Sequence, residues 1–130
     1  MEIEKIFKNL ILADFVVIIL MVISSMYQPS EISNVYEKLN DGLLDKFENF
    51  SRILSISLFF LYLFTLNLLY RFISYGKSIY LFLVVAGIVL NYFNGAVIYT
   101  AFGGLLDQVG GLISGAILIL LYFSPIKNNF

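Results

Sequence analysis

Four long apolar stretches divide the sequence, and the segments between them hold most of the charged residues. The stretches predict helices over residues 9–27, 51–73, 78–100 and 105–124, approximately. Each is near the roughly 20 residues that a helix needs to cross a hydrocarbon core of about 30 Å. None alternates polar and apolar positions as a barrel strand does, and an open strand would leave backbone groups unpaired in lipid. The pattern therefore predicts an all-α membrane protein, a four-transmembrane-helix bundle that forms a single domain over residues 1–130.

The first stretch has a charged start and an apolar middle, which are also features of a cleaved signal peptide. Asp14 interrupts that middle, however, and the region around Ser24 and Ser25 matches a small-residue cleavage site only weakly. We therefore expect the first stretch to be kept as a transmembrane helix.

Lysine and arginine are unevenly distributed between the short turns. The turn 71–77 carries Arg71 and Lys77, whereas the turn around Gly103 carries no cation. Cations concentrate on the cytoplasmic side of membrane proteins. We therefore expect a multi-pass protein of the cell membrane, specifically a bacterial inner membrane, with both termini in the cytoplasm.

The segment 28–50 is the only sizeable part predicted to lie outside the bilayer. Apolar residues recur in it at spacings of three and four: Ile32, Val35, Tyr36, Leu39, Leu43 and Phe47. This spacing predicts a short amphipathic surface helix between the first two membrane helices, started by Ser30 or Ser33 and broken at Asp41-Gly42. Its acidic face also fits a docking surface for a basic partner. A cation site is disfavoured, because the acids lack the spacing of a calcium loop.

Polar residues inside a membrane are costly, so they are the best indicators of a functional site. If residue 8 marks the inner interface, Asp14 lies about 9 Å into the bilayer. Asn67, on the second membrane helix, falls at a similar depth, and Arg71 lies one turn closer to the interface. These three residues are expected to form one inner cluster. We interpret it as a polar clasp between two helices, or alternatively as a site where Asp14 takes up a proton or cation during transport, or meets headgroup-level water.

A second polar set is expected toward the outer side, where the third and fourth membrane helices form a hairpin. Its polar members are Asn91, Asn94, Asp107 and Gln108. Small residues that recur along the two facing helices accompany it: Gly87, Gly95, Gly104, Gly111, Ser114 and Gly115. Small residues allow close helix packing, within the chain or between copies. Gly111 and Gly115 form a GxxxG pattern, which alone is a weak signal of helix packing. A third interpretation is therefore a solvated path lined by Asn and Asp.

The composition removes several classes of chemistry. The chain has no cysteine and no histidine, so thiolate metal sites and the usual general base are missing. With a net charge of −1 it has no basic field for nucleic acid. No phosphate-binding glycine loop is present, and Asp14 and Asp107 fall at opposite leaflets, which does not suit a pair of catalytic carboxylates. We expect no enzyme activity, no cofactor and no metal.

The function expected from these observations is that of a small multi-pass subunit, working in scaffolding, assembly or regulation. Its partners would be the lipid bilayer and either further copies of itself or another membrane protein. The alternative is a minimal oligomeric transporter or channel for protons, cations or a small solute, with Asp14 as the coupling group.

Overall fold

The computed structural model describes residues 2–27, 29–39, 48–93 and 98–130. Its elements are α1 (Glu2–Met26), α2 (Ser30–Leu39), α3 (Glu48–Tyr70), α4 (Ser74–Phe93), α5 (Ala101–Phe123) and a 3₁₀ turn, η2 (Pro125–Asn129). In this part of the chain α1, α3, α4 and α5 are each long and apolar enough to cross a membrane. The predicted all-α bundle of four transmembrane helices is confirmed.

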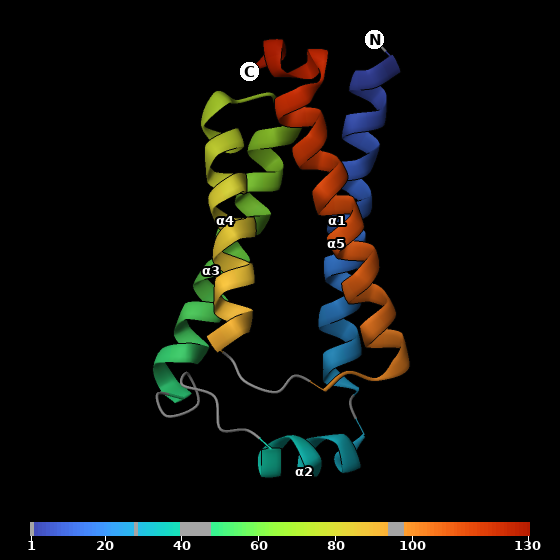
Figure 1. The fold of residues 1–130 in the computed structure, drawn as a ribbon, viewed down its shortest axis with the longest axis vertical. Helices are drawn as coiled ribbons and strands as arrows, with labels where there is room; N and C mark the ends of the chain where they lie inside the picture. Colours follow the sequence, from blue (N-terminus) through green and yellow to red (C-terminus); the bar gives the residue numbers. More distant parts are fainter. Residues whose placement is uncertain (1, 28, 40–47, 94–97) are drawn as a thin grey trace.

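The four long helices form two pairs. α1 packs most extensively on α5, and α3 packs on α4, while contacts between the pairs are fewer. Figure 1 shows the pairs close together at the end that holds both termini and spread apart at the other end. We call these the terminal end and the α2 end.

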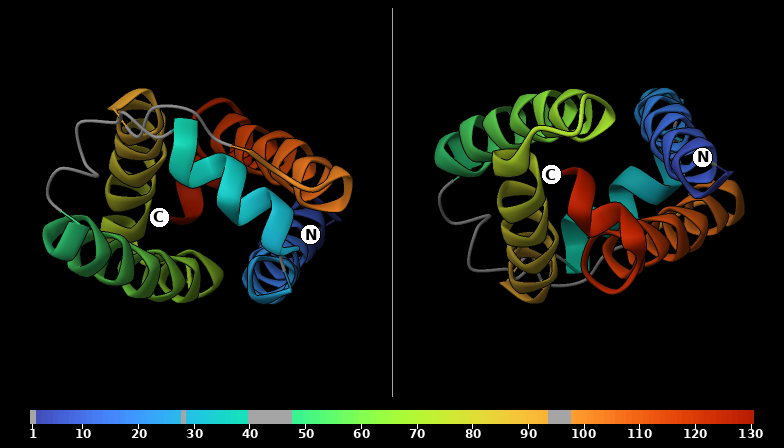
Figure 2. Two further views of the ribbon diagram at one scale, coloured as in Figure 1. Left: turned by 90° about the horizontal axis from the view of Figure 1, so that it is seen from below. Right: turned by 90° about the horizontal axis from the view of Figure 1, so that it is seen from above.

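The short helix α2 lies crosswise at the α2 end (Figure 1) and, seen from below, passes beneath the space between the pairs (Figure 2, left). It starts at Ser30, directly after Pro29. The side chain of Ile32, in its first turn, is half-buried. The predicted surface helix is therefore present over residues 30–39. Its predicted continuation through Leu43 and Phe47, and the break at Asp41-Gly42, lie outside the described residues.

The helix boundaries differ from those predicted by a few residues, and the differences are largest at the start of α1 and the end of α4. α1 already begins at Glu2, where Glu2 and Glu4 place negative charge against the positive end of the helix dipole. The described part of α4 runs to Phe93, and residues 98–100 are not helical as predicted, because Thr100 caps the start of α5. The Thr100 hydroxyl accepts a hydrogen bond of 3.0 Å from the backbone N–H of Gly103.

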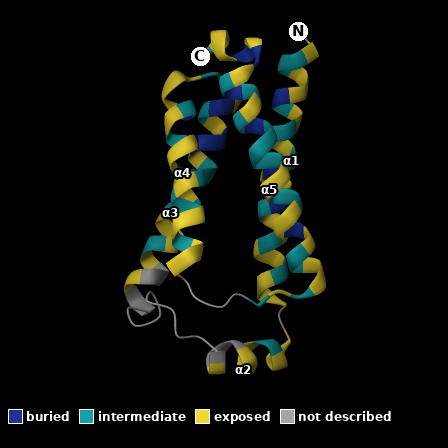
Figure 3. Cartoon of the chain, viewed as in Figure 1, coloured by how far each residue is buried: buried dark blue, intermediate teal, exposed yellow. Residues whose placement is uncertain are grey.

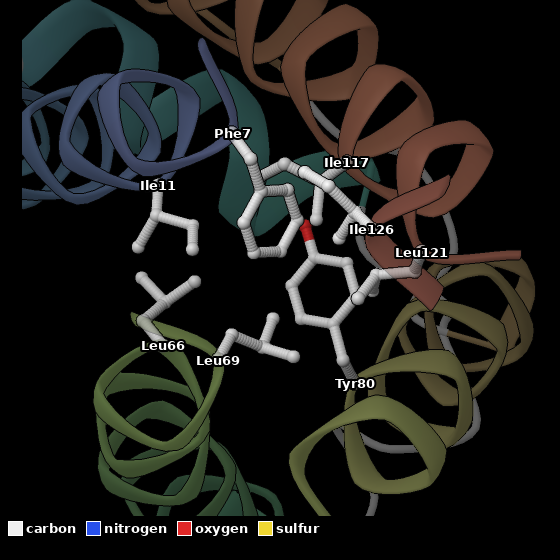
Figure 4. Packing of buried hydrophobic residues seen from close by; sticks show 8 residues of the cluster. All are labelled: Phe7, Ile11, Leu66, Leu69, Tyr80, Ile117, Leu121 and Ile126. Carbon is white, nitrogen blue, oxygen red and sulfur yellow. The ribbon is translucent and has the colours of Figure 1, made fainter. Parts of the chain in front are cut away.

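Most of the buried residues lie in the half of the bundle nearest the termini (Figure 3). Eight side chains from α1, α3, α4, α5 and η2 point toward one another there and form one cluster (Figure 4): Phe7, Ile11, Leu66, Leu69, Tyr80, Ile117, Leu121 and Ile126. Lipid is as apolar as these side chains, so close packing and dispersion, not the expulsion of water, hold such a cluster together. This cluster joins the two helix pairs.

The turn between α3 and α4 is held by backbone hydrogen bonds that close the C-terminus of α3. The N–H of Ile73 bonds to the carbonyl of Leu68, and that of Phe72 to the carbonyl of Leu69, both at 3.0 Å. This is a Schellman motif, whose left-handed position is usually glycine. Here it is Phe72, with φ of 56°. Its ring stacks on Phe7 at 5.8 Å between centroids, so aromatic contacts hold a backbone conformation that costs about 1 kcal/mol or more.

The outer surface of the four long helices is strongly apolar. Phe60, Ile88, Leu112 and Phe123 are among many large hydrophobic side chains that are more than half exposed. Soluble monomers rarely expose a continuous apolar surface of this kind. Lipid is therefore the solvent that suits these helices.

Candidate functional site

Asp14 lies on the face of α1 that points into the bundle. The buried residues of this helix are Phe7, Ile11, Asp14 and Val17, at spacings of four, three and three, which is one face of an α-helix. Only 2% of Asp14 is exposed. The apolar neighbours one turn away on either side therefore fix this carboxyl group inside the protein and away from lipid.

The Tyr62 hydroxyl, on α3, donates a hydrogen bond to Oδ2 of Asp14, with 2.7 Å between the oxygens. The same hydroxyl lies 3.3 Å from the hydroxyl of Tyr80 on α4 and 3.4 Å from Oγ of Ser114 on α5. A phenol carries one proton. Because Asp14 takes that proton at the shortest distance, the Tyr62 oxygen is left to accept from the Ser114 hydroxyl. Four hydroxyl or carboxyl groups, one from each long helix, thus meet at one point.

The structure separates Asp14 from the two residues expected beside it. Asn67 and Arg71 are both exposed, and no lysine or arginine among the described residues forms an ion pair with Asp14. The reason is helix geometry: Asn67 follows Tyr62 by five residues, which turns it about 140° around α3. Equal depth in the membrane did not imply the same face, and neutral hydroxyl groups take the place of the expected counter-charge.

An open cavity of about 670 Å³ extends from this polar group toward the α2 end, between the two helix pairs. All four long helices line it, and its wall is mostly apolar. The polar side chains in the wall are Ser55, Tyr62, Asn91 and Ser114. Tyr62 and Ser114 therefore belong to both the cavity and the hydrogen-bonded group around Asp14. A cavity of this size and character is typical of a site for a small molecule.

The glycines expected to bring α4 and α5 together line the cavity instead. A Cβ added at Gly87, Gly111 or Gly115 would meet nothing within 4 Å. α5 packs on α1, where Gly110 would place a Cβ 3.5 Å from Val17. α4 and α5 belong to different pairs, so adjacency in sequence did not produce a tightly packed hairpin.

The outer polar set does not gather into one cluster in the described part of the chain. Asn91 is exposed and lines the cavity, whereas Asp107 and Gln108 are exposed on α5 without lining it. Asn94 and Gly95 lie outside the described residues. A Cβ added at Gly104 would lie 3.7 Å from Cβ of Tyr99, which belongs to the segment directly before α5.

Sequence reasoning did not single out Tyr62 and Tyr80, the partners of Asp14. Both lie in apolar, aromatic-rich helices, where a tyrosine is easily taken for lipid-facing bulk. One signal was available: Tyr62, Leu66 and Leu69 share a helical face with Thr65, so the hydroxyls of Tyr62 and Thr65 lie on the side that faces the bundle. Comparison of the chain with protein-family models, curated proteins and solved structures gives no match, so the function is argued from this site.

Proposed function

We propose that this protein is a non-enzymatic membrane transporter that carries a small amphipathic solute through the cavity between its helix pairs, with Asp14 as the coupling group. One observation carries the proposal. A carboxyl group that is 2% exposed reaches a cavity of about 670 Å³ through a single hydroxyl, that of Tyr62. Buried ionisable groups in membrane helices are costly and often belong to proton or ion pathways.

The hydrogen bonds suggest how a proton on Asp14 would alter the cavity. When Asp14 is ionised, it accepts the Tyr62 proton, and Tyr62 offers the cavity an acceptor oxygen. When Asp14 carries a proton, its own O–H can donate to Tyr62, and the Tyr62 proton is free to turn toward Ser114 or a bound solute. The cavity therefore offers an acceptor in one state and a donor in the other, which links solute affinity to protonation.

The test uses purified protein in liposomes that contain a trapped pH-sensitive dye. A quaternary aromatic ammonium ion and a neutral aromatic alcohol are added in turn, because neither carries protons across a bilayer by acid–base exchange. We expect one of these solutes to drive proton movement in the wild-type protein. Asp14→Asn should reduce that flux at least tenfold, and Tyr62→Phe should reduce it severalfold, since it interrupts the contact between the cavity and Asp14.

Asp107→Asn is the matched control, because it makes the same chemical change at an exposed carboxyl group that does not line the cavity. It should leave the flux unchanged. The transporter proposal fails if Asp14→Asn moves protons as fast as the wild type, or if the wild type moves none above protein-free liposomes.

A second function, that of a subunit in a homo-oligomer or a larger membrane complex, is favoured by the glycine-lined face of α5. Gly111 and Gly115 line the open cavity with nothing within 4 Å of an added Cβ, so under this second function a helix of a neighbouring protein would pack there in place of a solute. Native mass measurement in nanodiscs separates the two proposals. A fixed stoichiometry or a retained partner, together with silent liposomes, supports the subunit function.

We further propose that the terminal end faces the cytoplasm of a bacterial inner membrane. Its support is the position of Lys5, Lys8, Arg71, Lys77 and Lys127, which all belong to the segments at that end (Figure 1). Cations of this kind mark the cytoplasmic side. Reporters fused to the two termini should both be cytoplasmic, and an external signal from either one would contradict this orientation.

A further inference from the structure

Two neighbouring hollows lie on the outside of the α1–α3 contact, away from the central cavity. The first, which we call the α1–α3 groove, has a volume of about 260 Å³ and is lined by Ile11, Leu12, Phe15, Leu63, Leu66, Asn67 and Tyr70. The second, which we call the lysine hollow, has a volume of about 340 Å³ and is lined by Glu4, Lys5, Lys8, Asn9, Leu12 and Tyr70. Leu12 and Tyr70 line both, so the two hollows adjoin each other. Together they form a trough that is apolar toward the bilayer centre and basic at the terminal end.

The lysine hollow has cationic groups that are available to an anion. Lys8 is held by two aromatic rings, with Nζ 5.1 Å from the centroid of Tyr70 and 5.2 Å from that of Phe72. Lys5, one turn earlier on the same helix, is exposed. The acidic lining residue Glu4 already accepts a hydrogen bond of 2.8 Å from the Asn129 side chain through Oε1. No ion pair ties either lysine to a carboxylate within the described residues.

Asn67 is an independent sign that a polar ligand lies here. It is exposed in an otherwise apolar groove, one turn deeper in the membrane than the end of α3 at Tyr70. An exposed amide in lipid is costly without a hydrogen-bond partner. The ester carbonyls of a phospholipid lie just below its phosphate, at the depth that such an amide would reach.

We infer that this trough is a binding site for an anionic phospholipid. The lipid phosphate would lie in the lysine hollow, an ester carbonyl beside the Asn67 amide, and an acyl chain along the α1–α3 groove. The apolar groove favours a lipid over a free phosphate, because it adjoins the basic hollow and an acyl chain can lie in it while the phosphate of the same lipid lies in the hollow. This inference does not depend on the proposed transport function.

Native mass spectrometry of protein released from nanodiscs tests the inference. Nanodiscs would contain phosphatidylglycerol and phosphatidylcholine with identical acyl chains. We expect one phosphatidylglycerol to be retained in preference to phosphatidylcholine. Lys5→Gln/Lys8→Gln should reduce this preference by about an order of magnitude, because each lysine contributes to attraction of an anionic lipid.

The matched control is Lys77→Gln/Lys127→Gln, which removes two cations from the same end of the molecule but away from the trough. It should keep the preference. Asn67→Leu retains every charge and should still weaken lipid retention. It therefore tests the same site independently if the lysine variant fails to fold.

Three outcomes would overturn the inference. They are equal retention of the two lipids, equal loss in the control and in the lysine variant, and displacement of the lipid by millimolar inorganic phosphate, which would assign the hollow to a soluble anion.

Discussion

Gly76 lies in the first turn of α4, directly against the end of α3. A Cβ at this position would lie 2.9 Å from Cβ of Leu68 and 3.2 Å from the backbone nitrogen of Leu69. Real Cβ atoms do not approach a neighbour so closely, and a backbone nitrogen cannot move aside as a side-chain tip can. The α3–α4 pair therefore depends on the missing side chain at this residue.

Gly76→Ala should destabilise the protein by about 1–3 kcal/mol, the usual cost of overpacking. The measurement is thermal unfolding in detergent, followed by loss of helical circular dichroism or by aggregation. Gly87→Ala is the control, since its Cβ would meet nothing within 4 Å. It should leave the midpoint unchanged or raise it slightly, because alanine favours helix more than glycine does. An equal loss in both variants would show that close approach at Gly76 is not the cause.

At the scale of elements, the hydrophobic pattern was enough to predict four membrane helices and a surface helix. Uninterrupted apolar runs as long as a bilayer is thick have few alternative structures, because every backbone group must be paired in lipid. The pattern did not predict that residues 98–100 are non-helical, since Ile98 and Tyr99 are still apolar and the start of α5 depends on its Thr100 cap.

The choice of helix partners was also not predictable from the pattern. Small residues at Gly87, Gly111 and Gly115 favour close packing, but they do not determine which helix approaches. The sequence singled out Asp14, whereas its partners depended on rotation about α3. That rotation is set by the packing of Leu66 and Leu69 in the buried cluster, which involves all the helices together.

At the scale of the whole molecule, the cavity exists because the two helix pairs meet mainly at the terminal end. A larger side chain on its wall should therefore occupy the cavity without disturbing the fold. Gly115→Leu should change the free energy of unfolding by less than about 1 kcal/mol, since nothing lies within 4 Å of the new Cβ. It should also reduce solute-driven proton flux in liposomes severalfold, as it fills part of the cavity.

The corresponding control is Gly104→Leu, on the same helix but outside the cavity wall. It should leave the flux unchanged. Full flux in Gly115→Leu, with the protein intact, would show that solute does not pass through this space.

The buried cluster at the terminal end also determines how the protein can respond to a ligand. Any conformation open at that end must separate Leu69 and Tyr80 of the α3–α4 pair from Phe7 and Leu121 of the α1–α5 pair, which are all almost completely buried. A ligand shifts such an equilibrium only by the difference between its affinities for the two conformations. Trimming one cluster residue would therefore change the populations of the two conformations before any ligand binds. The packing that holds the pairs together thus also determines which conformation is more populated when no ligand is bound.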